Sequence, residues 1–376
     1  MIETLSKTIV KTQKVRLYTE AEPFHFERGD ELGPVDVAFE TYGELNSSGT
    51  NCILICHALT GNAHVAFYNS DEDKVPGWWD SIIGPGKSID SSKYFVVCSN
   101  VIGGCYGTTG SSTLDPKTLK EYGNAFPPGT IRDMVRVQKR LLDWLGVKKV
   151  QLVIGGSMGG MQAIEWAVSF PEMVERVAPI ATGASHTAWG IALNEVARQA
   201  IFNDPAYRNG NYYAFGQPSR GLALARMIAM ISYRSPESFT LRFQRERLSE
   251  DNGANFFDVK NIYQVESYLH YQGVKLVERF DANTYIYISR AMDMHDVARD
   301  RGELRDVLRG IKCRTLCIGI TSDVLYPAEE QRGLAAMIPG ARYAEIRSIH
   351  GHDAFLIEFD QLNRIITDFL ESNLKI

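Results

Sequence analysis

Short apolar runs recur along the chain, and segments with helical periodicity lie between them. Each run is largely apolar along its whole length, which is typical of strands buried on both faces of a parallel sheet. Strands that alternate with helices predict a doubly wound α/β fold, with a mostly parallel central sheet flanked by helices. The runs span residues 52–59, 93–101, 150–156, 176–184, 313–320 and 341–346.

Two further segments refine this prediction. Residues 35–45 alternate between apolar and polar side chains with a period of two, so we expect them to add an antiparallel edge strand. Residues 130–145 place apolar side chains on one side of a helix. Thr130 and Asp133 have the spacing of a capping box at its start, and Gly146 ends it.

The alternation stops at about residue 186 and resumes at Cys313. Between residues 186 and 302 the sequence shows helical patterns and polar, glycine-rich loops, but no run typical of a strand. The economical interpretation is a single α/β core formed by residues 1–185 and 303–376. Residues 186–302 would then form a helical lid inserted into that core.

Composition excludes several classes of protein. The 376 residues are 44% hydrophobic and 23% charged, so the chain is neither disordered nor collagen-like. A net charge of −5 argues against a broadly basic nucleic-acid binder. No apolar stretch is long enough to span a bilayer, and residues 1–17 lack a signal-peptide pattern. We therefore expect a cytoplasmic protein with neither nucleic acid nor membrane as a partner.

The cysteines and histidines give no sign of a metal site. Four of the six cysteines form two C-x-x-x-C pairs, Cys52 with Cys56 and Cys313 with Cys317, whereas zinc sites use C-x-x-C. Residues four apart lie on one face of a strand, so the pairs are expected to be thiols buried in the sheet. No histidines and carboxylates cluster at ligand spacing, so we expect no metal.

The most specific motif is G-x-S-x-G at residues 155–159, where the third apolar run ends and a helical pattern begins. This strand–turn–helix context is the one that a nucleophile elbow requires. Ser157 would present its hydroxyl at the tip of the strand, and the helix that follows would favour developing negative charge there. An ordinary glycine-rich turn is the alternative. The context favours a nucleophile.

A serine nucleophile needs a base, and the base needs an orienting carboxylate. In this fold the chain order is serine, acid, histidine. Asp323 follows the fifth apolar run, although it could instead serve only to form a turn. His352 follows the sixth run and is the expected base, with His350 as the alternative. Both lie where strand carboxyl ends meet, which is the ligand-binding edge of an open α/β sheet.

An oxyanion hole needs two backbone amides. One should come from Met158, the residue after the nucleophile, and the other from Leu59 or a neighbour in the loop 58–61. His57 ends the preceding strand, and its position favours a role in orienting that loop over a catalytic one.

Together, HALTG (57–61), NVIGGCYGTTG (100–110), GGSMGGMQAIEWA (155–167), SDVLYP (322–327) and GHDAFL (351–356) resemble the homoserine O-acyltransferase family of the α/β-hydrolase fold. The resemblance runs from residue 35 to the C-terminal helix. It implies acyl transfer from an acyl-CoA to the hydroxyl of L-homoserine, in the first committed step toward methionine. It also implies a triad of Ser157, Asp323 and His352, with Leu59 and Met158 at the oxyanion hole.

The resemblance implies an amino-acid pocket as well. Arg226 would bind the homoserine carboxylate, Asp353 its ammonium group, and Tyr233 would line the pocket. From the sequence alone, Arg226 could equally be a solvated helix residue and Asp353 a helix cap. Family members usually form homodimers through the lid helices. One position departs from the family pattern: Ser111 stands where proline is common, which predicts a looser loop.

The acyl donor is the remaining choice, because the family divides between acetyl and succinyl groups. The segments expected to line the acyl site are residues 58–61, 157–162 and 100–110, and none contains lysine or arginine. A buried succinyl carboxylate would need a cation, so the sequence favours acetyl-CoA as co-substrate, with no permanently bound cofactor. A succinyltransferase, and an esterase or thioesterase with the same triad, are the alternatives.

Overall fold

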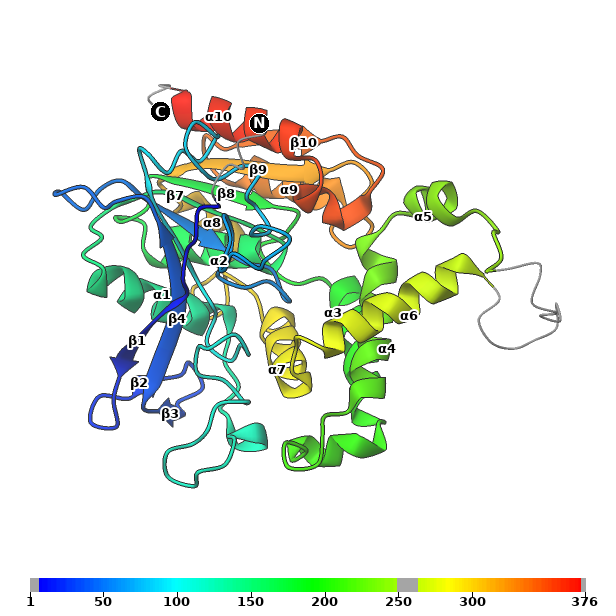
Figure 1. Ribbon diagram of the computed structural model, residues 1–376. Helices are drawn as coiled ribbons and strands as arrows, with labels where there is room; N and C mark the ends of the chain where they lie inside the picture. Colours follow the sequence, from blue (N-terminus) through cyan, green and yellow to red (C-terminus); the bar gives the residue numbers. More distant parts are fainter. Residues whose placement is uncertain (1–6, 249–262, 373–376) are drawn as a thin grey trace, which may run out of the picture.

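The structure is a computed structural model that describes residues 7–248 and 263–372. An eight-stranded sheet crosses its centre, with helices on both faces (Figure 1). Neighbouring strands are parallel throughout the larger part of the sheet, which confirms the predicted α/β-hydrolase type of fold. In spatial order the strands are β1 (Gln13–Tyr18), β4 (Val35–Tyr42), β6 (Phe95–Ser99), β5 (Cys52–Cys56), β7 (Val150–Gly156), β8 (Arg176–Ile180), β9 (Arg314–Ile320) and β10 (Arg342–Ile346).

All six apolar runs form strands of this sheet, but the prediction of an edge position for residues 35–45 is wrong. These residues form β4, which is antiparallel to β6 as expected. However, β1 pairs antiparallel with β4 on the side of β4 that faces away from β6, and β1 therefore forms the edge of the sheet. Half of the residues of β1, QKVRLY, are exposed, and no apolar run marks the strand. A separate two-stranded sheet consists of β2 (Phe24–His25) and β3 (Glu31–Leu32).

The sheet separates two apolar cores, and β5 shows how. Cys52, Leu54 and Cys56 belong to the core on one face, and Ile53 and Ile55 to the core on the other. All six cysteines are free thiols, as the buried-thiol interpretation requires, and burial raises the pKa of Cys105 and of Cys313 to about 11. The core helices are α1 (Ile131–Trp144), α2 (Met158–Ser169), α8 (Leu304–Arg309), α9 (Ala328–Met337) and α10 (Phe359–Glu371).

The helix α1 begins and ends as its sequence predicts. The Thr130 hydroxyl accepts a hydrogen bond from the Asp133 amide at 3.2 Å, and the Asp133 carboxylate accepts one from the Thr130 amide at 3.1 Å. A cap of this kind contributes about 1 kcal/mol to stability. Gly146 has a φ of 84°, which ends the helix at little steric cost.

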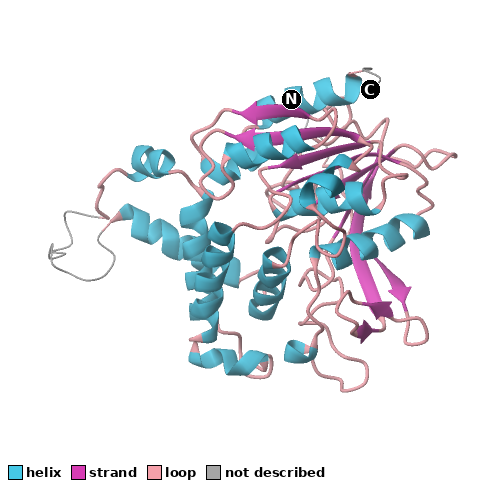
Figure 2. Ribbon diagram, turned by 180° about the vertical axis from the view of Figure 1, so that it is seen from behind, coloured by secondary structure: helices cyan, strands magenta, loops and turns pink. Residues whose placement is uncertain are grey.

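Between residues 186 and 302 the described part of the chain contains helices and loops and no named strand. These helices gather beside the sheet (Figure 2). Among them, α4 packs against α3, against α6 and against the short helix η3 (Gly351–Leu356) of the core. Residues 249–262 of this segment lie outside the described residues. The helices are α3 (Ala188–Phe202), α4 (Ser219–Tyr233), α5 (Pro236–Phe243), α6 (Gln264–Val277) and α7 (Ala282–Asp293).

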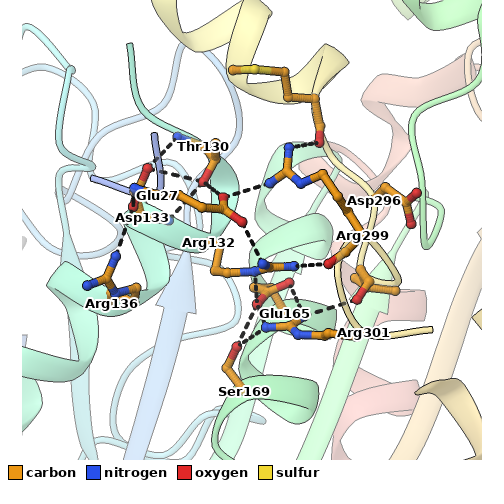
Figure 3. Close-up of polar contacts among 12 residues, drawn as sticks. Glu27, Thr130, Arg132, Asp133, Arg136, Glu165, Ser169, Asp296, Arg299 and Arg301 are labelled. Carbon is orange, nitrogen blue, oxygen red and sulfur yellow. Dashed lines mark hydrogen bonds and ion pairs between the residues drawn. The ribbon is translucent and has the colours of Figure 1, made fainter. Parts of the chain in front are cut away.

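A cluster of ion pairs joins the chain after α7 to the core (Figure 3). Arg132 of α1 lies between Glu27, at 2.5 Å, and Glu165 of α2, at 3.3 Å. Arg299 pairs with Glu27, and Arg301 pairs with Glu165, each at 2.6 Å. Arg299 and Arg301 lie at the C-terminal end of the segment 186–302, so the cluster fixes that end to α1 and α2. No helix in the described residues is both long and apolar enough to cross a membrane.

Candidate active site

Ser157 lies in a strained turn between β7 and α2. Its φ of 58° and ψ of −124° are sparsely populated values for a residue with a side chain, as a nucleophile elbow requires. Its amide donates a 2.9 Å hydrogen bond to the carbonyl of Ile180 at the end of β8. The residue is 6% exposed. The sheet therefore holds this serine rigidly at the carboxyl ends of its parallel strands.

Two glycines let the turn pack against the neighbouring strand. A Cβ atom on Gly155 would lie 2.4 Å from the carbonyl oxygen of Cys56, and one on Gly159 would lie 2.1 Å from the same atom. Neither contact is sterically possible, so the glycines of the motif serve close backbone packing.

His352 and Asp323 form a buried pair. The Nδ1 atom of His352 lies 2.6 Å from Oδ2 of Asp323. The Oδ1 atom of Asp323 accepts hydrogen bonds from the amides of Leu325 at 2.8 Å and Tyr326 at 2.9 Å. One carboxylate oxygen thus forms the turn, and the other is available to orient the histidine. His350 has no hydrogen bond to Asp323.

The environment of His352 suits a general base. Burial lowers the pKa of the imidazole, but the charge of Asp323 and the hydrogen bond to Asp323 raise it. The pKa of His352 therefore lies above 6.5. Its Nε2 atom is buried and has no hydrogen-bond partner among the described residues. Because Nδ1 is bound to Asp323, Nε2 is the nitrogen left to exchange a proton.

Three aromatic rings surround His352. The ring centroids of Tyr326, Phe355 and Tyr233 lie 5.3, 5.6 and 5.8 Å from that of the imidazole. The Tyr326 hydroxyl lies 3.0 Å from Nδ1 of His186, whose pKa is lowered to about 4, chiefly by burial. The sequence analysis did not predict this contact between Tyr326 and His186. The first stands three residues after Asp323, whereas nothing in the sequence marks the second.

Two free amides lie where an oxyanion hole is expected. The amides of Leu59 and Met158 donate no hydrogen bond to any other described residue. Leu59 lines the same pocket as Ser157. His57 stabilises the adjoining loop, as predicted: its Nδ1 lies 2.8 Å from the Ala58 carbonyl, and its Nε2 accepts from the Val101 amide at 3.2 Å. Burial lowers the pKa of His57 to about 4, so this ring is neutral.

The pocket at Ser157 is small and uncharged. Its volume is about 20 Å³, enough for about one water-sized group. Among the residues that the structure describes, no lysine, arginine, aspartate or glutamate lines it. The expectation that residues 100–110 line it is wrong, because this loop is bonded to β4 through Thr108 and Thr109. The lining comes instead from Leu59, Ser157, Leu325 and Tyr326 of the core and from residues of α3, α4 and α7.

The chain is similar to several known proteins in sequence and in structure. A family described as the α/β hydrolase fold matches residues 51–358. A homoserine O-acetyltransferase of Carboxydothermus hydrogenoformans is 51% identical over 367 residues and covers 96% of each chain, and one of Moorella thermoacetica is 50% identical, covering 95% of this chain and 96% of its own. The chain belongs to the homoserine O-acetyltransferase family. Among solved structures, the homoserine O-acetyltransferase of Bacillus anthracis is 30% identical, covers 98% of this chain and 99% of its own, and has a TM-score of 0.90.

Esterases share the fold of this family. A structure of esterase E22 is 30% identical to this chain, covers 96% of it and 100% of its own chain, and has a TM-score of 0.88. The fold alone therefore does not separate acyl transfer to an alcohol from hydrolysis, and the surroundings of Ser157 must decide.

The residues that the family resemblance marked for an amino acid lie around the triad. Arg226 and Tyr233 are two helical turns apart on α4, and the guanidinium carbon of Arg226 lies 5.5 Å from the Tyr233 ring centroid. Asp353 follows His352 in η3, and its Oδ2 lies 3.4 Å from Nε of Arg234. Sequence reasoning missed this ion pair, although Arg234 directly follows Tyr233.

The serine that departs from the family pattern is well anchored. Ser111 is fully buried, and its hydroxyl donates to Asp281 at 3.2 Å. Its carbonyl accepts a 2.8 Å hydrogen bond from the Gly123 amide. The sequence predicted a looser loop here, but these bonds replace the restraint that a proline ring would supply. Within the described residues no group of three or more histidine, cysteine, aspartate or glutamate side chains could hold a metal ion.

Proposed function

We propose that this protein transfers an acetyl group from acetyl-CoA to the hydroxyl of L-homoserine through an acyl-enzyme on Ser157, giving O-acetyl-L-homoserine for methionine biosynthesis. The observation that carries the proposal is the buried 2.6 Å bond between His352 and Asp323 beside the Ser157 elbow, in a chain 51% identical to a homoserine O-acetyltransferase.

In the proposed first half-reaction, the Oγ atom of Ser157 attacks the thioester carbonyl while Nε2 of His352 takes the hydroxyl proton. The amides of Leu59 and Met158 stabilise the negative oxygen of the tetrahedral intermediate. The carbon–sulfur bond then breaks, and His352 returns the proton to the departing thiolate. In the second half-reaction His352 takes the homoserine hydroxyl proton while the homoserine oxygen attacks the acyl carbonyl carbon. The bond from that carbon to Oγ of Ser157 then breaks, the new ester leaves, and His352 returns the proton to Oγ.

The size and charge of the pocket support acetyl over succinyl. A cavity of about 20 Å³ suits the methyl group of an acetyl ester, whereas a succinyl chain is several atoms longer. A succinyl carboxylate would also be buried without a cation, at a cost of several kcal/mol. The arginines of α4 and its C-terminal end do not change this, because Arg226 does not line the pocket and Arg234 pairs with Asp353.

Charge complementarity supports homoserine as the acceptor. Arg226 has no carboxylate partner among the described residues and suits the homoserine carboxylate. Asp353 suits its ammonium, because the 3.4 Å ion pair with Arg234 is long enough for a second cation to compete. Tyr233 lines the Ser157 pocket between them.

An esterase or thioesterase with the same triad is the second candidate, and the similarity to esterase E22 supports it. Release of free thiol from acetyl-CoA, followed with and without homoserine, separates the two functions. Release that depends on homoserine supports the transferase. Equal release in both conditions would identify a hydrolase.

The mechanism is tested by intact mass spectrometry. Mixing the protein with acetyl-CoA alone should add one acetyl group, and Ser157→Ala should abolish both this adduct and nearly all turnover. An adduct that persists in the variant would refute the assignment of Ser157. Arg226→Ala and Asp353→Asn should slow the homoserine half-reaction much more than acetylation, because each removes a charged contact to the acceptor.

We further propose the organisation in which this reaction occurs. Residues 1–185 and 303–376 form the catalytic core, and residues 186–302 form a lid over Ser157. The protein acts in the cytoplasm as a homodimer joined through the lid helices, and the exposed apolar residues on these helices support that surface. Light scattering on Ile231→Glu, which places a charge on this surface, tests it. The exposed residues are Val196, Leu224, Ile231, Tyr271 and Val274.

A further inference from the structure

A second, larger cavity lies close to the Ser157 pocket. Its volume is about 380 Å³, compared with about 20 Å³ for the pocket at the serine. Its walls come from the loop 58–64, the loop 76–78, Arg226 of α4, Arg279 between α6 and α7, and residues 355–356 of η3. We call it the outer groove.

The outer groove reaches the catalytic centre at two points. Ala58 lines it and directly precedes Leu59, which lines the pocket at Ser157. Phe355 also lines it, and its ring packs so closely on the elbow that a Cβ atom on Gly156 would lie 2.5 Å from it. The same ring is 5.6 Å from that of His352. A molecule in the groove therefore lies next to the triad.

The groove is positively charged. Arg226 and Arg279 line it, and no aspartate or glutamate within residues 7–248 and 263–372 does. Among the described residues neither arginine pairs with a carboxylate. Arg279 is exposed and donates only to neutral acceptors, the Thr60 carbonyl at 2.8 Å and the Tyr106 hydroxyl at 2.6 Å. A guanidinium fixed in this way still has N–H groups free to bind an anion.

If the proposed function is correct, the leaving group of the donor lies outside the pocket at Ser157, which has room only for the acyl group, and the outer groove approaches the triad at Ala58 and Phe355. Coenzyme A carries phosphate groups beyond its pantetheine arm, and phosphates are the anions that arginine binds best. Arg226 lies over Tyr233 beside the triad, where the homoserine carboxylate is proposed to bind. Arg279, at the exposed part of the groove, remains for the donor.

We propose that the outer groove binds the coenzyme A part of the donor and that Arg279 is its phosphate-binding residue. This inference rests on the proposed function and extends it by assigning the residue that distinguishes a nucleotide-bearing thioester from a simple one. Trp78, which also lines the groove and whose Nε1 is held by the Asn62 carbonyl at 3.0 Å, provides an aromatic wall beside the same path.

The test compares two donors that differ only in their phosphates and nucleotide, acetyl-CoA and acetyl-pantetheine. Arg279→Gln should lower kcat/KM for acetyl-CoA about 10- to 100-fold, the usual effect of losing a charged hydrogen bond. It should leave kcat/KM for acetyl-pantetheine and the KM for homoserine close to the wild-type values. The wild-type preference for acetyl-CoA should weaken as salt is added, and the variant should lose that dependence.

Two control variants separate charge from structure. Lys275→Gln removes an exposed cation about one helical turn earlier. Lys275 lies over Tyr271 and does not line the groove, so this variant should leave kcat/KM unchanged for both donors. Tyr106→Phe removes one hydrogen bond to Arg279 but keeps its charge, so the preference for acetyl-CoA should persist.

Several outcomes would overturn the inference. An equal loss for both donors in Arg279→Gln would show that Arg279 only supports the loop at Thr60. Equal use of both donors by the wild-type protein would show that the phosphates are not bound. Both results leave acetylation of Ser157 intact, whereas failure of the proposed function would appear as no acetylation from either donor.

Discussion

Asp323→Asn should inactivate the protein through the tautomer of His352. In the wild-type structure one carboxylate oxygen of Asp323 accepts two backbone amides, from Leu325 and Tyr326, and the other binds Nδ1 of His352 at 2.6 Å. Asparagine has one oxygen, and the two amides require it. Its NH₂ group therefore faces Nδ1, which must now accept a hydrogen bond. The imidazole proton moves to Nε2, and that atom can no longer accept the proton of Ser157.

The loss is large because the wrong tautomer removes general-base catalysis. In serine hydrolases an equivalent change lowers kcat about 10⁴-fold, which corresponds to about 5.5 kcal/mol in the activation barrier. The assay is the rate of Ser157 acetylation by acetyl-CoA in a single turnover, with the thermal melting temperature measured alongside it. Asp306→Asn on α8 is the matched control, since its side chain is 75% exposed.

The pH dependence provides an independent check. The imidazole must be neutral to act as a base, and Asp323 holds its pKa above 6.5 against the effect of burial. Wild-type acetylation should therefore rise with pH, with a midpoint above 6.5. In the variant that charge is absent while burial remains, so the midpoint should fall. A variant within about tenfold of wild-type activity, or with an unchanged midpoint, would contradict this account of the triad.

Two further predictions concern stability and are read from urea unfolding. Gly156→Ala should destabilise the protein by about 1–3 kcal/mol, since the new Cβ atom would lie 2.5 Å from the Phe355 ring. Gly333→Ala in α9 should instead stabilise the protein by about 0.5–1 kcal/mol, because its Cβ atom would meet no atom within 4 Å. Equal changes in the free energy of unfolding for the two glycine variants would mean that the Phe355 ring moves aside without cost. Arg198→Met should lower the free energy of unfolding by about 3–5 kcal/mol, because this fully buried arginine pairs with the buried carboxylate of Asp293 at 2.6 Å. Arg290→Met, at a half-exposed arginine beside the same carboxylate, should cost no more than about 1 kcal/mol, and a similar loss in both would refute the role of burial.

The sequence by itself determined the parts of this protein that local patterns encode. A strand buried on both faces must be apolar along its length, so six strands were visible as runs. The elbow was visible because Gly155 and Gly159 must meet the Cys56 carbonyl closely, and only glycine permits that. Ser157, Asp323 and His352 each follow a predicted strand, and the carboxyl ends of parallel strands meet at one edge of the sheet, so the sequence predicted that they lie close together. The chemistry of the site was therefore readable before its geometry.

The tertiary structure alone decided what depends on packing between distant segments. The polar strand β1 forms the edge because β4 offers it a hydrogen-bonding partner, not because its own sequence is apolar. His186 reaches Tyr326 across 140 positions of sequence, and Ser111 reaches Asp281 across 170. The pairing of Arg234 with Asp353 also needs α4 to pack on η3. Such contacts have no local signal, because each partner alone resembles an ordinary polar residue until the fold buries both together.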